Sequence, residues 1–539
     1  MRARHLLHSL ARSQDAAVAP TVALSLFGLI AVGGLAFDYA RMATLDTELQ
    51  AAADQAALAA ATQLDGKTGA CGRAARAAVN LVANQTLFAN ETGGNLAVTV
   101  PLETGCDQTG NVRFYKTKAR VAATTDADAN FVEVTVNSRE AFFALTPIVQ
   151  MLRSGALTGT AFAGLGSAIC KVPPVMMCNP NEGGDAGFTT SNYIGKGLRL
   201  VSVGNGPGAW AAGNFGYLDS HGGSGGVPGL QEDLGWLNPP GDCSPETGVD
   251  TKPGGNVPAT DALNTRFDIY DSNSACQSGG SCPPSINTVK DLMRPVSASG
   301  NNACKMHNQG WQEPSQDDKR YLPNATNSAT DSTLTPDVMG HPRDKCHASL
   351  SSATGHCNGP VGDGAWDRNT YFRANYSWDS SQWPTYTGLG SAPTRYQVYQ
   401  WEIAHRGETI GGRTILGPRT VGSLTDHDQP ICSSLQTPSY GAGIVPGGSN
   451  VDRRRISVAV INCAANSVNG NSRNVPVEKW IEVFLVEPSL NRGSVTSGSH
   501  GRSGTNAGDV YVEVIGETIA GAGSTAGQVV RRDVPYLIE

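Results

Sequence analysis

"LQAAADQAALAAATQL", residues 49–64, is the stretch that decides the fold of this chain. Alanine fills eight of its sixteen positions, which strongly favours a helix but buries little surface per residue. Its apolar residues recur mostly at spacings of three and four, giving a narrow stripe of small side chains on one helix face. Small side chains let backbones approach closely. The stripe therefore packs either on helices of other proteins or on the chain's own globular domain, and the spacing alone leaves both open.

A hydrophobic segment lies eleven residues before this helix. Ala16 to Phe37, "AAVAPTVALSLFGLIAVGGLAF", contains no charge in 22 residues, which is long enough to cross a bilayer. No Gly or Pro occurs from Asp38 to Leu64, so we expect one helix to continue outward. A cleaved signal peptide is the competing interpretation, but the length of the run favours an uncleaved anchor. An excess of arginine before the span predicts a cytoplasmic N-terminus; these residues are Arg2, Arg4 and Arg12.

The composition excludes several classes of protein. Charged residues make up 16% of the 539, the net charge is −7 and the sequence pI is about 5.8, so we expect no nucleic-acid partner. With 64 glycines and 30 prolines, much of the chain should be loop. These values describe a loop-rich, non-cytosolic protein.

Twelve cysteines all follow the apolar span, and an even number in an oxidising compartment indicates disulfides. The pairs Cys170/Cys178 and Cys276/Cys282 are near enough in sequence to close small loops, although the connectivity as a whole cannot be deduced from sequence. The expected disulfide cysteines are Cys71, Cys106, Cys170, Cys178, Cys243, Cys276, Cys282, Cys304, Cys346, Cys357, Cys432 and Cys463.

The segment "FDYARMATLDTELQAAADQAALAAATQL", residues 37–64, resembles the N-terminal region of TadE/TadG-like proteins of the tight-adherence (Tad/Flp) pilus system. In that family a membrane span ends at an Asp, here Asp38, and an alanine-rich helix of pattern LQ-x-A-A-D-x-A-A-L-A-A-A follows. The residues that match this pattern are Leu49, Gln50, Ala52, Ala53, Asp54, Ala56, Ala57, Leu58, Ala59, Ala60 and Ala61. The resemblance covers about 50 residues.

The resemblance implies a single-pass inner-membrane protein of a Gram-negative bacterium, with its N-terminus in the cytoplasm and its bulk in the periplasm. Its implied partners are other Tad proteins, namely pilin-like subunits and the inner-membrane assembly platform. A helix–helix assembly motif would comprise Asp38, Leu49, Gln50, Ala53, Asp54, Ala57 and Leu58. Asp54 would select a partner, or would simply be a solvated carboxylate. Because the family's Gly before the span and Glu inside it are absent, we expect no prepilin processing.

We expect an α+β fold: a transmembrane helix continuing into a long pilin-like helix, followed by a mainly β, loop-rich, disulfide-bonded periplasmic region. The expected division is a cytoplasmic N-terminus (1–15), a transmembrane helix (16–37), an alanine-rich helical segment (38–92), a β-rich subdomain (93–170), a Gly/Pro-rich region (171–395) and a β-rich C-terminal region (396–539). In the last region "RYQVYQWEIA", "RRRISVAVINCA", "VEKWIEVFLVEP" and "DVYVEVIGE" each predict a strand.

Three motifs offer chemistry, and a structural interpretation is favoured for each. "HPRDKCHASLSSATGHC", residues 341–357, holds enough His and Cys to bind zinc, but a Cys346–Cys357 disulfide with incidental histidines fits an oxidising compartment better. "GGSGG", residues 222–226, would need a strand before Ser224 and a helix after it to be a nucleophile elbow, and neither is expected. "TDHD", residues 425–428, reads as a solvated turn. We therefore expect no catalytic, cofactor-binding or metal-binding residues.

The favoured function is a non-enzymatic, membrane-anchored component of a Tad/Flp pilus assembly and secretion system that supports pilus biogenesis and adherence. The alternative is a cell-surface or released adhesin with a pilin-like anchor. A membrane-tethered periplasmic hydrolase is a further alternative, which a buried, perturbed carboxylate or His in a deep pocket would favour.

Overall fold

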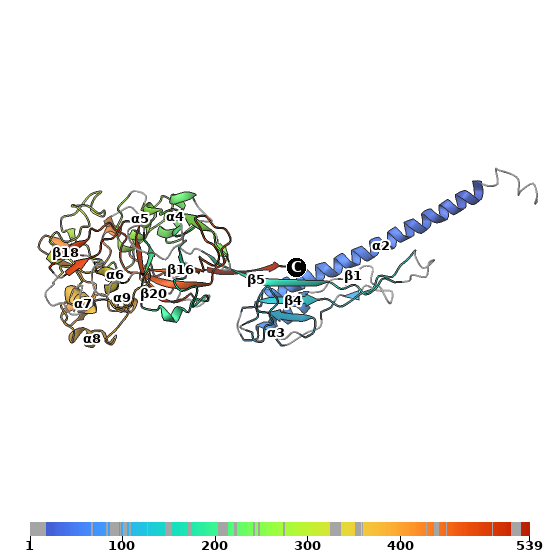
Figure 1. The fold of residues 1–539 in the computed structure, drawn as a ribbon, viewed down its shortest axis with the longest axis horizontal. Helices are drawn as coiled ribbons and strands as arrows, with labels where there is room; N and C mark the ends of the chain where they lie inside the picture. The colour runs from blue at the N-terminus through green and yellow to red at the C-terminus, as the bar shows by residue number, and fades with distance from the viewer. Residues whose placement is uncertain are drawn as a thin grey trace, which may run out of the picture. The chain divides into compact units, whose positions relative to one another are not determined.

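The computed structural model describes residues 18–65, 68–81, 85–86, 96–97, 99–100, 105–106, 109–126, 128–145, 153–170, 174–202, 214–219, 224–240, 243–245, 248–272, 275–323, 336–350, 357, 359–426, 428–435, 441–448, 450–498, 500–518 and 530–538. The chain forms two compact units (Figure 1). The first comprises residues 1–166 with 533–539, and the second comprises residues 167–532.

The first unit is built on one long helix, α2 (Val18–Ala61), whose 44 residues extend about 66 Å at 1.5 Å per residue. Among the described residues it is the one helix long and apolar enough to cross a membrane. Its N-terminal part extends beyond the strands of this unit (Figure 1). From Leu45 onward one face of α2 is buried. The expected continuous helix is thereby confirmed.

An antiparallel sheet and a second helix cover the buried face of α2. The sheet has the order β21-β5-β4-β3, and helix α3 (Ala70–Leu81) packs against α2. The strands are β3 (Val112–Tyr115), β4 (Phe131–Thr135), β5 (Thr160–Cys170) and β21 (Val530–Leu537), with a separate pair β1 (Gln85–Thr86) and β2 (Leu96–Ala97).

The alanines of α2 allow a very close approach between helix and sheet. Ala52, Ala53, Ala56 and Ala57 are fully buried in the core of the first unit. A Cβ atom added to Gly159, immediately before β5, would lie 2.3 Å from the carbonyl oxygen of Leu49. Only small side chains on both elements permit this spacing, so the alanine stripe packs on the chain's own domain.

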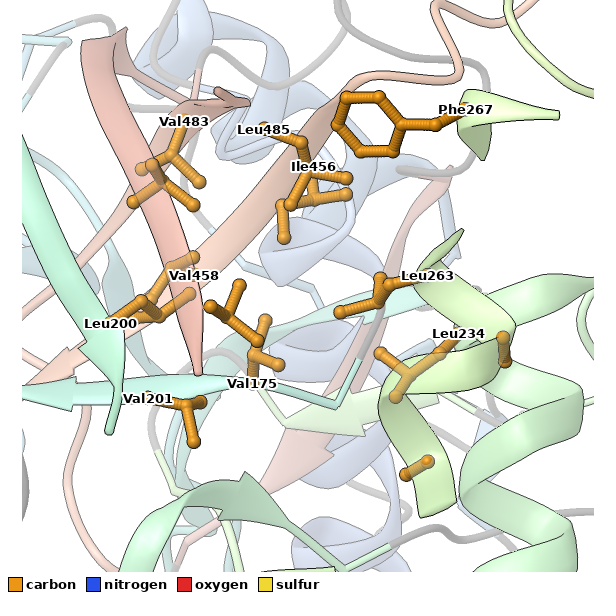
Figure 2. Packing of buried hydrophobic residues seen from close by; sticks show 14 of the residues in the cluster. Val175, Leu200, Val201, Leu234, Leu263, Phe267, Ile456, Val458, Val483 and Leu485 are labelled. Carbon is orange, nitrogen blue, oxygen red and sulfur yellow. The ribbon is translucent and has the colours of Figure 1, made fainter. Parts of the chain in front are cut away.

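The second unit contains a five-stranded sheet of order β6-β16-β17-β20-β7, in which β6 and β16 are parallel and the other pairs antiparallel. Its strands are β6 (Met176–Cys178), β7 (Gly197–Val201), β16 (Arg455–Ile461), β17 (Lys479–Leu485) and β20 (Val510–Glu517). Leu234 and Leu263 from two helices pack on this sheet against residues such as Ile456 (Figure 2).

Short helices and strands complete the second unit. The helices are α4 (Gly226–Gly235), α5 (Thr260–Asn264), α6 (Lys345–Ala348), α7 (Arg368–Tyr376), α8 (Gln382–Thr387), α9 (Arg395–Ala404) and α10 (Cys432–Leu435), with 3-10 turns at Thr190–Asn192, Val257–Ala259, Thr265–Phe267 and Asp317–Lys319. The remaining strands are β8 (Asn214–Leu218), β9 (Cys243–Pro245), β10 (Thr251–Pro253), β11 (Arg294–Pro295), β12 (Thr409–Ile410), β13 (Arg413–Thr414), β14 (Arg419–Val421), β15 (Leu424–Asp426), β18 (Val495–Ser497) and β19 (His500–Arg502).

The strand predicted at "RYQVYQWEIA" is wrong, because these residues form helix α9. Thr394 and Gln397 make a reciprocal capping box at its start. The carboxylate of Glu513 on β20 accepts the backbone N–H groups of Arg395 and Tyr396, at 3.0 and 2.9 Å. These bonds satisfy first-turn donors that would otherwise be unpaired, and they attach α9 to β20.

Five disulfides are formed among the described residues: Cys71–Cys106, Cys178–Cys463, Cys276–Cys282, Cys304–Cys432 and Cys346–Cys357. The suggested Cys170/Cys178 loop is wrong, because Cys178 bonds Cys463 across the parallel β6–β16 pair. Cys170 is instead the ladder partner of Cys243. A long apolar helix followed by a mainly β region with several disulfides confirms the predicted α+β class.

Candidate functional site

The N-terminal half of α2 presents an apolar surface that the described residues of its own unit leave exposed. Large side chains around the whole helix are exposed, with Leu24 at 70% and Val32 at 66%. In water such a surface would be strongly unfavourable over this length, whereas in a bilayer each of these side chains meets acyl chains. The described exposed members are Val18, Val22, Leu24, Leu26, Phe27, Leu29, Ile30, Val32, Leu35, Phe37 and Tyr39.

Asp38 closes this apolar surface and is itself only 1% exposed. Its two carboxylate oxygens accept the backbone N–H groups of Ala144 and Leu145, at 2.8 and 2.9 Å. Each oxygen has one main-chain donor, so the charge is placed where hydrogen bonds compensate its burial. Asp38 therefore ties the loop after Ala141 to the helix at the end of the apolar surface.

Gly34 lies one helical turn before Asp38 and is also buried. A Cβ atom there would lie 3.0 Å from Cβ of Leu145 and 3.5 Å from its carbonyl oxygen. The glycine thus lets the main chain of Leu145 lie directly against α2. Together, Gly34 and Asp38 hold the same loop at two levels along the helix.

The residues of the expected assembly motif divide into two groups. Leu49, Ala53 and Ala57 are fully buried in the core of the first unit, whereas Gln50, Asp54 and Leu58 are half-buried. The outward face of α2 beside them consists of other side chains, which are exposed: Ala43, Thr44, Asp46, Thr47 and Gln55.

Asp54 has a partner within the first unit. Nε2 of Gln50 donates to Oδ1 of Asp54 at 2.9 Å and to the carbonyl oxygen of Thr160 at 3.0 Å. Asp54 therefore orients an amide that links α2 to the first residue of β5. Neither of the two interpretations that the sequence left open for Asp54 included this contact. The bond between Gln50 and Asp54 follows the i,i+4 spacing of a helix, whereas the bond to Thr160, 110 residues away, has no signal in the spacing.

Residues 16–63 match the family described as "Putative Flp pilus-assembly TadE/G-like". The N-terminal segment, residues 16–63, is TadE/TadG-like. The matched residues contain the exposed apolar part of α2, Asp38 and the buried alanine stripe, so the TadE/TadG-like segment is the anchor-like helix together with its packing face. No curated protein and no solved structure matches the chain.

The Cys and His residues considered as zinc ligands in the second unit make other contacts. Cys346 and Cys357 form a disulfide, so neither offers a thiolate. His347 Nδ1 lies 2.9 Å from the hydroxyl oxygen of Tyr511, and Nε2 lies 3.0 Å from the carbonyl oxygen of Gly359. Burial lowers the pKa of His347 to about 4, and the nearby Arg199 adds to this effect. His356 lies outside the described residues.

A buried ionic cluster joins α9 to the sheet of the second unit. Arg395 donates to Glu513 at 2.7 Å and also bonds the carboxylate of Asp344, and all three side chains are essentially inaccessible. Burial disfavours the charge on Asp344, but Arg395 holds the pKa of Asp344 below its ordinary value. Breaking such a pair would leave an uncompensated charge, so the cluster fixes how these elements pack.

His341 and Glu402 are the groups that most resemble catalytic residues. His341 is buried, lines a cavity together with Arg343 and Arg492, and burial holds its pKa well below the ordinary value. Its Nε2 lies 3.9 Å from a carboxylate oxygen of Glu402.

Glu402 is already saturated by internal donors. Tyr371, Tyr376 and Asn287 donate to it at 2.5, 2.9 and 2.7 Å. The arginines that line the cavity are paired as well: Arg343 with Glu487 at 2.6 Å, and Arg492 with Asp291 at 2.7 Å. The polar residues around His341 and Glu402 are thus arranged as in a packed polar core.

The nucleophile-elbow motif has more of the required context than the sequence indicated. β8 ends at Leu218, six residues before Ser224, and α4 begins two residues after Ser224, so the expected absence of a following helix is wrong. Ser224 is nevertheless exposed, and its φ is not positive. Its backbone N–H donates to Glu232 at 3.0 Å. The sharp, strained turn that defines an elbow is absent at Ser224.

The TDHD motif differs from its expected position, and the turn before β16 is more buried than its charge suggests. Asp428 of "TDHD" is 8% exposed and therefore buried, whereas a solvated turn was expected. Arg453 and Arg454, which open "RRRISVAVINCA", are fully buried. Arg453 donates to the carbonyl oxygen of Pro283 at 2.8 Å, and Arg454 to that of Leu485 at 3.0 Å. These partners are distant in sequence, so spacing gave no signal for either burial.

Proposed function

We propose that this chain is a non-enzymatic, membrane-anchored component of a Tad/Flp pilus assembly and secretion system, supporting pilus biogenesis and surface adherence. The observation that carries the proposal is the TadE/TadG-like match over an exposed apolar helix whose C-terminal part packs on the core of the first unit. Its partners would be pilin-like subunits and the inner-membrane assembly platform.

The proposed topology is a single pass through the inner membrane of a Gram-negative bacterium, with the N-terminus in the cytoplasm. Three arginines precede the apolar helix, in keeping with the excess of positive charge on cytoplasmic flanks. The five disulfides found among the described residues lie beyond it, and disulfides persist in oxidising compartments such as the periplasm.

Partners would contact the surfaces of α2 that its own unit leaves exposed. The alanine stripe is buried in the core of the first unit, so it is not available for contact with another protein. Two surfaces remain on the helix: the apolar part up to Phe37, and the outward face that includes Asp46 and Gln55. Lateral packing of the apolar part in the membrane is the favoured mode, because helix–helix association in lipid depends on close van der Waals contact.

The test is complementation of a deletion strain, with Flp pili counted by electron microscopy. We expect the deletion to lose pili and the full chain to restore them. A chain whose residues 1–37 are replaced by a cleavable secretory signal should not restore them, because both units would then be unanchored. Normal pilus numbers and normal adherence in the deletion strain would refute the assembly role. Normal pili with lost adherence would favour the adhesin alternative.

The same strain tests whether the protein is an enzyme. His341→Gln removes the group that most resembles a catalytic residue, and we expect this variant to restore pili as wild type does. Loss of pili with a variant that is present at wild-type level, and whose disulfides are intact, would favour the hydrolase alternative instead.

A further inference from the structure

The loop that Asp38 holds is itself apolar where it meets the helix. The stem of this loop is formed by bridges between Arg139 and Leu157 and between Phe142 and Arg153. The sequence between the two arms, "FALTPIVQML" (143–152), contains no charged residue. Of its described part, Phe143 is half-buried and Leu145 is 52% exposed.

The position of this loop along α2 sets its depth relative to the apolar surface. Leu145 lies against Gly34, which is four residues, or about 6 Å, N-terminal to Asp38. Leu145 therefore lies beside the last turn of the exposed apolar helix. This turn also carries Leu35 and Phe37, which are each 51% exposed. The exposed apolar surface of the loop thus continues that of the helix at the same level.

We propose that the described arm of this loop, Phe142 to Leu145, is a second membrane contact, lying at the headgroup–acyl boundary of the same bilayer leaflet from which α2 emerges. We define the contact surface, the interfacial patch, by its described residues: Leu35, Phe37, Tyr39, Phe142, Phe143 and Leu145. The occupant is phospholipid. The inference rests on the proposed membrane anchoring of α2.

The chemistry of the interfacial patch suits this boundary and not the hydrocarbon core. Non-helical main chain is not tolerated where lipid tails surround it, but it is tolerated at the interface, where insertion is about 5–10 Å deep. Aromatic rings are enriched at this level in membrane proteins, and the patch supplies four. Arg153 lies over the ring of Phe142, 4.5 Å from its centroid, and pairs with Glu140 at 3.4 Å, with its side chain 53% exposed; a lipid phosphate would reach the exposed part of this guanidinium.

The loop also has a clear mechanical role in this arrangement. Asp38 joins it to the helix through two main-chain N–H groups, so an inserted loop and an inserted helix would form one rigid base. Such a base restricts rotation of the first unit about the helix axis. A single helix crossing the membrane would leave that rotation free.

Site-specific photocrosslinking in proteoliposomes tests the inference on the full chain. The benzophenone amino acid p-benzoylphenylalanine replaces Leu145 in one variant and Val121 in a control; Val121 is 53% exposed and so is equally accessible. A third variant carries it at Val22, which is 56% exposed inside the apolar helix. The probe is radiolabelled phosphatidylglycerol in phosphatidylethanolamine vesicles, and the readout is a lipid adduct on the purified chain after irradiation.

We expect lipid adducts at positions 22 and 145 and several-fold less at 121. Adducts at 22 without adducts at 145 would overturn the inference while leaving the membrane anchor intact. A protein adduct at 145 in place of lipid would also overturn it, in favour of a neighbouring chain. Equal labelling at 121 would refute a specific contact. Absence of adducts at 22 would refute the anchoring itself.

Discussion

At Gly159, immediately before β5, the main chain lies very close to the alanine-rich helix. A methyl group there would lie 2.3 Å from the carbonyl oxygen of Leu49 and 2.8 Å from the backbone nitrogen of Gln50. Both are main-chain atoms of a helix, so they cannot rotate away as a side chain would. The close packing of this unit therefore depends on a single missing methyl group.

Gly159→Ala should destabilise the first unit by about 1–3 kcal/mol, as overpacking of a well-filled core generally does. The measurement is hydrogen exchange of the segment 45–61 in the full chain, where protection should fall by the same amount. Gly155→Ala is the matched control, because a Cβ at Gly155 would meet nothing within 4 Å. Equal protection in the two variants would mean that helix and sheet are not as close as described.

His347 provides a pH-dependent test at the residue scale. Burial lowers its pKa to about 4, from an ordinary value near 6.5, so the native state resists protonation that the unfolded chain accepts. The contribution of His347 to the free energy of unfolding is therefore fully present above pH 6.5 and is lost as the pH falls toward 4. The full loss is ~3 kcal/mol, given 1.36 kcal/mol per pKa unit.

His347→Gln should accordingly flatten the pH dependence of urea unfolding between pH 6.5 and 4, with all disulfides intact. Comparing slopes removes the contribution of other buried carboxylates, which both proteins share. His307→Gln, at an exposed histidine, serves as the control for the loss of one imidazole. A His347→Gln profile parallel to that of wild type would show that the pKa of His347 is the same in the native and unfolded states.

At the scale of elements, periodicity identified the structure where burial is regular. The strands β16, β17 and β20 were predictable because apolar and β-branched residues run through them, and α2 because no Gly or Pro interrupts it after Asp38. Helix α9 was missed because Tyr396 and Val398 alternate as they would in a strand. The decisive signal, Thr394 and Gln397 at capping-box spacing, was present in the sequence.

The candidate site was less predictable than its helix. The alanine pattern located the segment that matters, but it could not decide between intermolecular and internal packing, since both need small residues. Internal packing is made possible by Gly159, which is 110 positions from Leu49 in the sequence. The same limit applies to the bond between Asp38 and the loop at Leu145, which depends on a chain reversal that no local pattern specifies.

At the scale of the whole molecule, the second unit is held by disulfides that close loops of very different length. Cys178–Cys463 spans 285 residues and joins the ends of two parallel strands, whereas Cys276–Cys282 spans 6. In the chain-entropy account, a cross-link stabilises by restricting the unfolded chain, and the effect grows with the logarithm of the loop length. The two bonds therefore differ in what they contribute, although both lie in one unit.

Replacing Cys178 and Cys463 together by serine should lower the free energy of unfolding by ~5 kcal/mol, against ~2 kcal/mol for the same change at Cys276 and Cys282. The second pair is a matched control, since three of these four cysteines are less than a tenth exposed. Urea unfolding of the full chain, followed by fluorescence of the tryptophans of the second unit, measures both losses. Equal losses would show that loop closure in the unfolded chain does not govern the stability of this unit. A larger loss at the long loop would mean that the second unit keeps its fold chiefly in an oxidising compartment, which is the environment that the proposed topology assigns to it.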